Sequence, residues 1–168
     1  AAFWAGQAHA AAGRPRAALA ELTSYLPRAG AAANGVRLRA ADLAVSSAQV
    51  SEARGLLNAV LTGDPTRLDR IEAWERLANL DSAAGRPAAA LAWLDQIISE
   101  AQVPSYRAGV LLRAAQAAAD AGDQAGARTR LVTLVTAYPD DAAAYSGLHR
   151  LLEADAAQLA YNMVAPCR

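Results

Sequence analysis

The chain has 168 residues, of which 54% are hydrophobic, and its 16 basic residues balance 16 acidic ones. A chain of this length suits one domain, and a net charge of zero provides no general basic field for nucleic acid and no polybasic patch for a membrane surface. Alanine is abundant and aromatic residues make up only 5%, a composition that favours helices over strands. We therefore expect an all-α protein that neither binds nucleic acid nor inserts into a membrane.

The sequence repeats itself along its length. Residues 11–22 read AAGRPRAALAEL and residues 83–94 read AAGRPAAALAWL, and two further segments, 45–61 and 118–135, align with them at spacings of 35, 37 and 37 residues. One aligned column holds small residues: Ala18, Ala53, Ala90 and Ala127. A second column, four residues later, holds leucines: Leu22, Leu57, Leu94 and Leu131. Alanine bias explains the first column but not the second, so the period is structural.

Each unit predicts a helix, a tight turn, a second helix and a short loop, because apolar or small residues recur at i, i+3, i+4 and i+7. In chain order the units cover about residues 1–32, 33–66, 67–103, 104–139 and 140–168. The fifth unit is partial, since no second matching helix follows DDAAAYSGLHRLL. Within it Tyr145 and Leu148 fit the pattern, whereas His149 takes a position that is usually small.

The predicted turns carry residues suited to helix ends. Three units have a glycine that can adopt the left-handed conformation after a helix: Gly13, Gly85 and Gly122. Ala48 replaces this glycine in the second unit. The next helix is expected to open with Pro15 or Pro87, or to be capped by Ser51 or Asp123. Four small residues of the first helices would face the alanine column and allow close packing: Gly6, Ala41, Ala78 and Ala115.

This pattern resembles the tetratricopeptide repeat (TPR). The third unit has residues at the family's offsets: Trp74, Leu77, Ala78, Gly85, Ala90, Leu94 and Ile97. The fourth unit adds Ala114, Ala115, Gly122, Ala127, Leu131 and Pro139. Departures are Arg37 at a bulky apolar position, Ala48, and Asp81 where an aromatic residue is usual. The resemblance implies a right-handed superhelix of stacked antiparallel helical hairpins, with about four repeats and a partial fifth, in one domain over residues 1–168 that we expect to belong to a longer chain.

The resemblance also implies that the first helix of each hairpin lines a concave face where a partner would bind. The residues expected there are Phe3, Gln7, Arg39, Asp42, Glu75, Arg76, Asn79, Arg113, Gln116, Arg150 and Glu153. Four of them, each 37 residues after the last, suggest an arginine ladder for an acidic or carboxylate-ended segment: Arg39, Arg76, Arg113 and Arg150. Alternatively these arginines pair with Asp42, Glu75 and Glu153 and only solvate the groove. The chain has no lysine, so the TPR subtype that clamps a C-terminal carboxylate is not predicted.

Motifs for catalysis or for a cofactor are missing from the sequence. It contains no glycine-rich phosphate loop, no serine elbow and no HExxH pattern. His9 and His149 lie far apart without a nearby cysteine, and the single cysteine is Cys167, so no metal site is predicted. Phe3 and Trp4 form either a ligand platform or a core that a preceding repeat would cover. We expect no catalytic, cofactor-binding or metal-binding residue.

Two functional hypotheses of different class follow. The first is a non-catalytic scaffold whose concave face binds a protein, a peptide or another domain of the same chain. The second is the helical arm of a cell-wall lytic transglycosylase, because the units are loosely similar to the N-terminal helical domain of soluble lytic transglycosylases, whose catalytic domain would lie outside this chain. Homodimerisation through the end faces stays open, as does the choice between cytoplasm and cell envelope.

Overall fold

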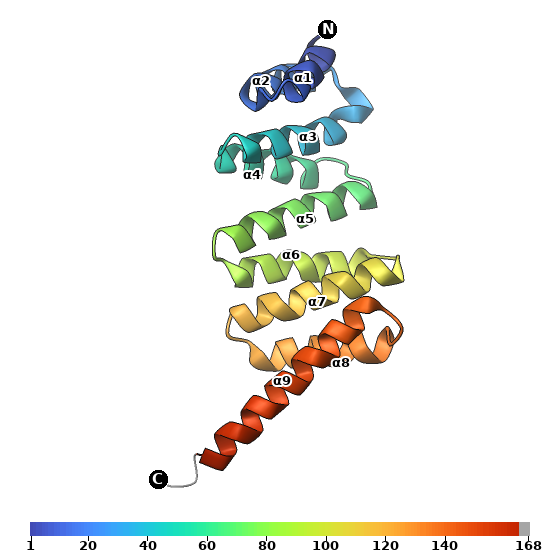
Figure 1. The fold of residues 1–168 in the computed structure, drawn as a ribbon. Helices are drawn as coiled ribbons and strands as arrows, with labels where there is room; N and C mark the ends of the chain where they lie inside the picture. Colours follow the sequence, from blue (N-terminus) through green and yellow to red (C-terminus); the bar gives the residue numbers. More distant parts are fainter. Residues whose placement is uncertain (165–168) are drawn as a thin grey trace. The chain divides into compact units, whose positions relative to one another are not determined.

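The computed structural model describes the backbone of residues 1–164 and the side chains of residues 1–156. Over this part of the chain it has nine α-helices, two short 3-10 helices and no strand (Figure 1). The expected all-α class is therefore confirmed. The chain divides into two compact units, Ala1–Leu80 and Asp81–Arg168, and the boundary falls within a helix.

The first unit contains four complete helices and most of a fifth. They are α1 (Ala2–Ala11), α2 (Pro15–Tyr25), α3 (Ala33–Ser46), α4 (Val50–Leu61) and α5 (Arg67–Ala83), with the 3-10 helices Leu26–Arg28 and Gly30–Ala32 between α2 and α3. Helix α1 packs against α2, α2 against α3, and α3 against α4. The leucines of the repeat pattern, Leu22 and Leu57, are buried, and so is Trp74 on α5. Burial of these apolar side chains stabilises the unit.

The second unit contains the end of α5 and four further helices. These are α6 (Pro87–Glu100), α7 (Pro104–Asp120), α8 (Gln124–Ala137) and α9 (Ala142–Val164). Helix α7 packs against α6, α8 and α9, and α8 also packs against α9. One buried cluster joins α7, α8 and α9 through Ala108, Leu111, Leu134 and Ala144.

Four turns share one set of backbone hydrogen bonds. In each, an N–H group donates to the carbonyl five residues earlier: Arg14 to His9, Gln49 to Ala44, Arg86 to Asp81, and Asp123 to Ala118. The residue before each donor has a positive φ: 67° at Gly13, 61° at Ala48, 67° at Gly85 and 87° at Gly122. This is the Schellman arrangement, which satisfies carbonyls at a helix end. The expected left-handed glycines are confirmed, and Ala48 adopts the same conformation despite its Cβ.

The starts of the following helices confirm most of the sequence-based expectations. Pro15 and Pro87 open α2 and α6, and Asp123 caps α8 by accepting a hydrogen bond of 2.8 Å from the Gly126 N–H. The expected cap at Ser51 is wrong, because α4 begins at Val50 and its N-cap position is Gln49, which makes no side-chain cap bond. The backbone of the turn fixes the position of the N-cap, since in all four turns the residue after the left-handed one is the N-cap of the next helix.

Small residues permit close helix packing where a side chain would collide. A Cβ on Gly6 would lie 2.9 Å from Leu22 Cδ2 and 3.3 Å from the Ala18 carbonyl oxygen, so α1 and α2 approach closely at this position. The other members of the two small-residue columns are buried as well: Ala18, Ala41, Ala53, Ala78, Ala90, Ala115 and Ala127.

Helix α9 departs from the expected pattern. Tyr145 and Leu148 fit the repeat in sequence, but their side chains are 71% and 44% exposed. Among residues 142–156 of α9, those buried are Ala144 and Gly147, and a Cβ on Gly147 would lie 3.0 Å from Leu134 Cδ2. The two positions that fit the repeat in sequence therefore lie in solvent, because the face of α9 that contacts α8 includes Ala144 and Gly147 instead.

Candidate functional site

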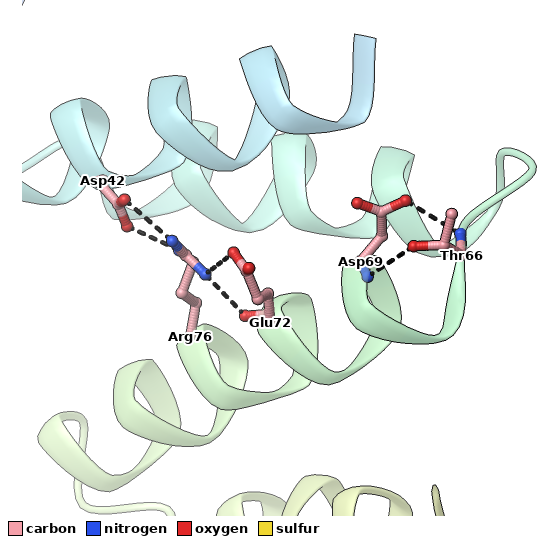
Figure 2. Close-up of polar contacts among 5 residues, drawn as sticks. All are labelled: Asp42, Thr66, Asp69, Glu72 and Arg76. Atoms are coloured by element: carbon pink, nitrogen blue, oxygen red, sulfur yellow. Dashed lines mark hydrogen bonds and ion pairs between the residues drawn. The ribbon is translucent and has the colours of Figure 1, made fainter. Parts of the chain in front are cut away.

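Arg76 lies at the centre of an ion-pair network in the first unit. Its Nε donates to Asp42 Oδ1 at 2.8 Å and its Nη2 to Asp42 Oδ2 at 3.1 Å, while its Nη1 contacts Glu72 Oε2 at 3.1 Å (Figure 2). The hydrogen bonds that Arg76 donates to Asp42 and the charges of both carboxylates raise the pKa of Arg76 above its usual value, against the opposing effect of burial. A bidentate pair of this kind fixes the guanidinium in place, and only 28% of the side chain is exposed.

This network matters for the two alternatives that the sequence leaves open. The predicted partner Asp42 does bind Arg76, whereas the second partner is Glu72, four residues earlier on the same helix, which the sequence analysis did not select. Every nitrogen of the Arg76 guanidinium is engaged by Asp42 or Glu72. A ligand carboxylate that binds Arg76 through two hydrogen bonds must therefore displace an existing contact.

The start of α5 carries a second polar group in the same unit. The Thr66 N–H donates to Asp69 Oδ2 at 2.9 Å and the Asp69 N–H donates to Thr66 Oγ1 at 3.2 Å (Figure 2). These two bonds form a capping box. Partial burial raises the pKa of Asp69, but the hydrogen bonds from Thr66 and Asn34 outweigh it, so the pKa lies below its usual value. The group therefore stabilises the start of α5.

In the second unit, two predicted residues meet at a hollow between α7, α8 and α9. We call it the C-terminal hollow; its volume is about 710 Å³. Ala119, Ala127 and Leu131 contribute apolar lining. Gln116 and Arg150 also line the hollow, and Arg150 Nη1 donates to Gln116 Oε1.

A second polar pair borders the C-terminal hollow. Arg128 on α8 forms an ion pair with Asp155 on α9, and the hydrogen bond with Asp155 raises the pKa of Arg128 above its usual value. The sequence analysis missed both residues, because Arg128 belongs to a second helix and only the approach of α9 brings Asp155 next to it. An apolar surface with a polar border suits a peptide side chain, and Asp155, the carboxylate in its lining, is held by Arg128.

The remaining predicted residues are distributed over both units. Phe3 is half-buried, and its ring lies 5.5 Å from Trp4 and 5.6 Å from Tyr25 between centroids. Gln7 and Glu75 are half-buried, whereas Arg39, Asn79 and Arg113 are exposed. Arg39 and Arg76 belong to the first unit, and Arg113 and Arg150 to the second.

A buried acidic residue is the main feature that the sequence analysis left without a role. Asp81 is 1% exposed, and its Oδ1 accepts from Arg86 Nε at 2.9 Å while its Oδ2 accepts from Trp93 Nε1 at 2.8 Å. We call Asp81, Arg86 and Trp93 the Asp81 cluster. The available signal was an aspartate in an apolar column, five residues before an arginine. With both oxygens bonded in a buried setting, the cluster is structural.

Other features of the described residues bear on cofactors and membranes. Along residues 1–156 no group of three histidine, cysteine, aspartate or glutamate side chains could hold a metal ion. His149 lies 3.3 Å from Glu153 on its own helix, and Cys167 lies outside the described residues. In the described part of the chain, no helix combines the length and the apolar character that crossing a membrane requires.

Comparison of the chain with models of protein families, with curated proteins and with solved structures gave no match.

Proposed function

We propose that the chain is a non-catalytic, TPR-like scaffold of helical hairpins that binds a peptide or protein segment on the face formed by its first helices. Three observations support the hairpin repeat: the spacing of the aligned columns, the shared hydrogen bonds of the four turns, and the burial of the small residues in both columns. The same turn geometry at equivalent positions is typical of repeat proteins.

The observation that carries the binding proposal is the C-terminal hollow. It brings Gln116 of α7 and Arg150 of α9 to one apolar depression of about 710 Å³. Among the described residues, the charged side chains along its lining are two arginines and one aspartate, so the site favours a segment with an apolar side chain next to an acidic one. The apolar side chain would occupy the depression, and the carboxylate would replace Gln116 as the partner of Arg150.

A pair of labelled peptides tests this proposal by fluorescence anisotropy. One peptide alternates leucine with glutamate, and the other, of equal length, alternates leucine with lysine. We expect the acidic peptide to bind about tenfold more tightly or better, because opposite charge favours the correct partner. Ala119→Phe, which fills the hollow, and Arg150→Glu, which reverses its charge, should each reduce the affinity about tenfold.

Arg107→Glu is the matched control for Arg150→Glu. Arg107 is exposed on the same unit and does not line the hollow, so its reversal changes the net charge equally without altering the site. Circular dichroism of all variants should match that of the unaltered protein. Equal affinity of the unaltered protein and of both hollow variants would remove the C-terminal hollow as the binding site.

A further inference from the structure

A second hollow lies in the first unit, at the turn end of its two hairpins. We call it the N-terminal hollow. Its volume is about 580 Å³, and it is lined by Arg14, Pro15, Arg16 and Ala17 from one turn and by Ser46, Ser47 and Ala48 from the next. Both turns belong to Ala1–Leu80, and the helices that carry them, α2 and α3, pack against each other. The lining contains two arginines and no acidic residue.

Two lining residues at the start of α2 carry backbone donors. The first hydrogen bond of the helix runs from the Ala18 N–H to the Arg14 carbonyl, so the N–H groups of Arg16 and Ala17 have no acceptor within the helix. Pro15 has no N–H, and no side chain caps this helix. In contrast, the side chain of Asp123 caps the start of α8 by accepting from the Gly126 N–H. The uncapped start of α2 therefore presents two donors and the positive end of a helix dipole.

The two arginine side chains add charge to these donors. Arg14 and Arg16 are both exposed, and neither forms a side-chain hydrogen bond or ion pair within residues 1–156. Arg86, which has the same place in the α5–α6 turn, is bonded to Asp81 instead. Only in the first turn are the guanidinium groups available to a ligand.

Ser47 supplies an independent observation. It lines the hollow, only 9% of the residue is exposed, and its hydroxyl has no hydrogen-bond partner within the described residues. A buried hydroxyl without a partner is uncommon and calls for a ligand or a water. The negative end of α3 does not cancel the site, because the carbonyls of Leu43, Ala44 and Val45 already accept N–H groups of the turn.

We propose that the N-terminal hollow binds a phosphate group. Two guanidinium groups, two N–H groups and one hydroxyl provide more donors than a single carboxylate can accept, whereas a phosphate carries up to two charges and three strong acceptor oxygens. Arg14 and Arg16 bind its charge, the N–H groups of Arg16 and Ala17 orient it, and Ser47 donates to it after rotation of its hydroxyl. This inference is independent of the peptide face, because none of its residues lines the C-terminal hollow.

Titration of the whole chain with inorganic phosphate, followed in proton–nitrogen spectra at constant ionic strength, tests the proposal. We expect saturable shifts of the Arg16, Ala17 and Ser47 amides. The double substitution Arg14→Gln with Arg16→Gln should weaken binding about tenfold or more, because phosphate contacts from arginine are charge-assisted. Ser47→Ala should weaken it several-fold and should fold normally, since it removes a hydroxyl that has no partner.

The control is Arg28→Gln with Arg67→Gln, which removes the same charge from two exposed arginines of the first unit that do not line the hollow. It should leave the affinity unchanged. Parallel titrations with acetate and with O-phosphoserine complete the experiment. Tighter binding of O-phosphoserine than of inorganic phosphate assigns the site to esterified phosphate, and the reverse assigns it to the free anion. Acetate binding as tight as phosphate binding, no saturable shift, or equal losses in the control and the double variant would each overturn the proposal.

Discussion

Two turns of this protein have the same sequence and the same backbone but different side-chain environments. Gly13-Arg14-Pro15 and Gly85-Arg86-Pro87 share a glycine at φ 67° and the same hydrogen bond to the carbonyl five residues earlier. Arg86 is held by buried Asp81, whereas Arg14 is exposed. His9 takes the place of Asp81 in the first turn, and its Nδ1 is buried without a partner among the described residues.

The comparison separates what fixes a turn from what fixes its side chains. Glycine and proline determine the backbone at both turns, because glycine permits the positive φ of the turn and proline fixes φ at the start of the next helix. Whether the arginine forms an ion pair depends on the residue five positions earlier, which belongs to the preceding helix. One turn becomes part of a structural cluster, and the other keeps its charge available to a ligand.

The largest expected effect comes from breaking the Asp81 cluster. Asp81→Ala leaves the Trp93 indole N–H and the Arg86 guanidinium without their buried acceptor. We expect a loss of about 2–3 kcal/mol in the free energy of unfolding, below the usual cost of breaking a buried pair because Arg86 can turn to solvent. Urea unfolding followed by circular dichroism measures it.

The control is Asp95→Ala, which also removes a carboxylate from an aspartate–arginine pair. Asp95 contacts Arg130 at 2.8 Å, but its side chain is 44% exposed. We expect a loss below about 1 kcal/mol, because solvent screens such a pair. Equal losses in the two variants would mean that burial does not distinguish the Asp81 cluster from a surface ion pair.

A smaller effect is expected from exchanging glycine and alanine at the left-handed position. A Cβ on Gly85 would meet nothing within 4 Å, so Gly85→Ala changes only backbone strain and should cost about 1 kcal/mol. Ala48, at φ 61°, already carries that strain. Ala48→Gly should therefore raise the free energy of unfolding by about 0.5–1 kcal/mol.

Gly55→Ala is the control for these exchanges. The thermal midpoint of unfolding of each variant is the measurement. Gly55 lies within α4, and a Cβ there also meets nothing within 4 Å. Because its φ is helical, alanine should stabilise it by about 0.5–1 kcal/mol. The interpretation of the turns fails if Gly85→Ala and Gly55→Ala shift the midpoint in the same direction.

The smallest effect is expected at the start of α5, which is stabilised by the ionisable side chain of Asp69 and not by a proline. The pKa of Asp69 is lowered in the folded protein, so its stabilising contribution is complete above the unfolded pKa near 3.8 and is lost as the pH falls through the folded pKa. We expect Asp69→Asn to lose about 0.3–1 kcal/mol at pH 7 and little at strongly acid pH. Urea midpoints at a series of pH values measure the difference.

Asp64→Asn, at an exposed position just before α5, is the control for Asp69→Asn. Its urea midpoints should follow those of the unaltered protein at every pH. A difference between Asp69→Asn and the unaltered protein that stays constant with pH would show that the capping-box carboxylate does not stabilise the fold through its charge.

The sequence was sufficient where the cause is local. Helix starts at Pro15, Pro87 and Asp123 and left-handed turns at Gly13, Gly85 and Gly122 follow from the conformational limits of these residues. The expected cap at Ser51 failed because Ala48 takes the glycine conformation without being a glycine. The repeat alignment places Ala48 at the glycine position, but an alanine there does not by itself indicate the left-handed conformation that makes Gln49 the N-cap.

The candidate site shows the same limit more clearly. Sequence spacing placed the side chains of this site on one expected face and named Asp42 as a possible arginine partner. The structure pairs Asp42 with Arg76 and Gln116 with Arg150, because residues of equivalent helices about 34 positions apart come together when hairpins pack. The sequence analysis did not select Glu72 as the second partner of Arg76 or Asp155 as the partner of Arg128. Asp155 lies on another helix, so only the packing of α9 on α8 brings it to Arg128. Glu72 lies four residues before Arg76 on the same helix, a spacing that the sequence does show.

By itself, the sequence determined the helical class, the turns and the small residues that allow close packing, since these depend on the backbone preferences of single residues and on a period of the chain. Tertiary structure alone decided which arginines are bonded and which are available. Arg14 and Arg86 are identical in sequence context at the turn, and they differ because long polar side chains take their partners from whatever the packed helices bring within hydrogen-bond distance.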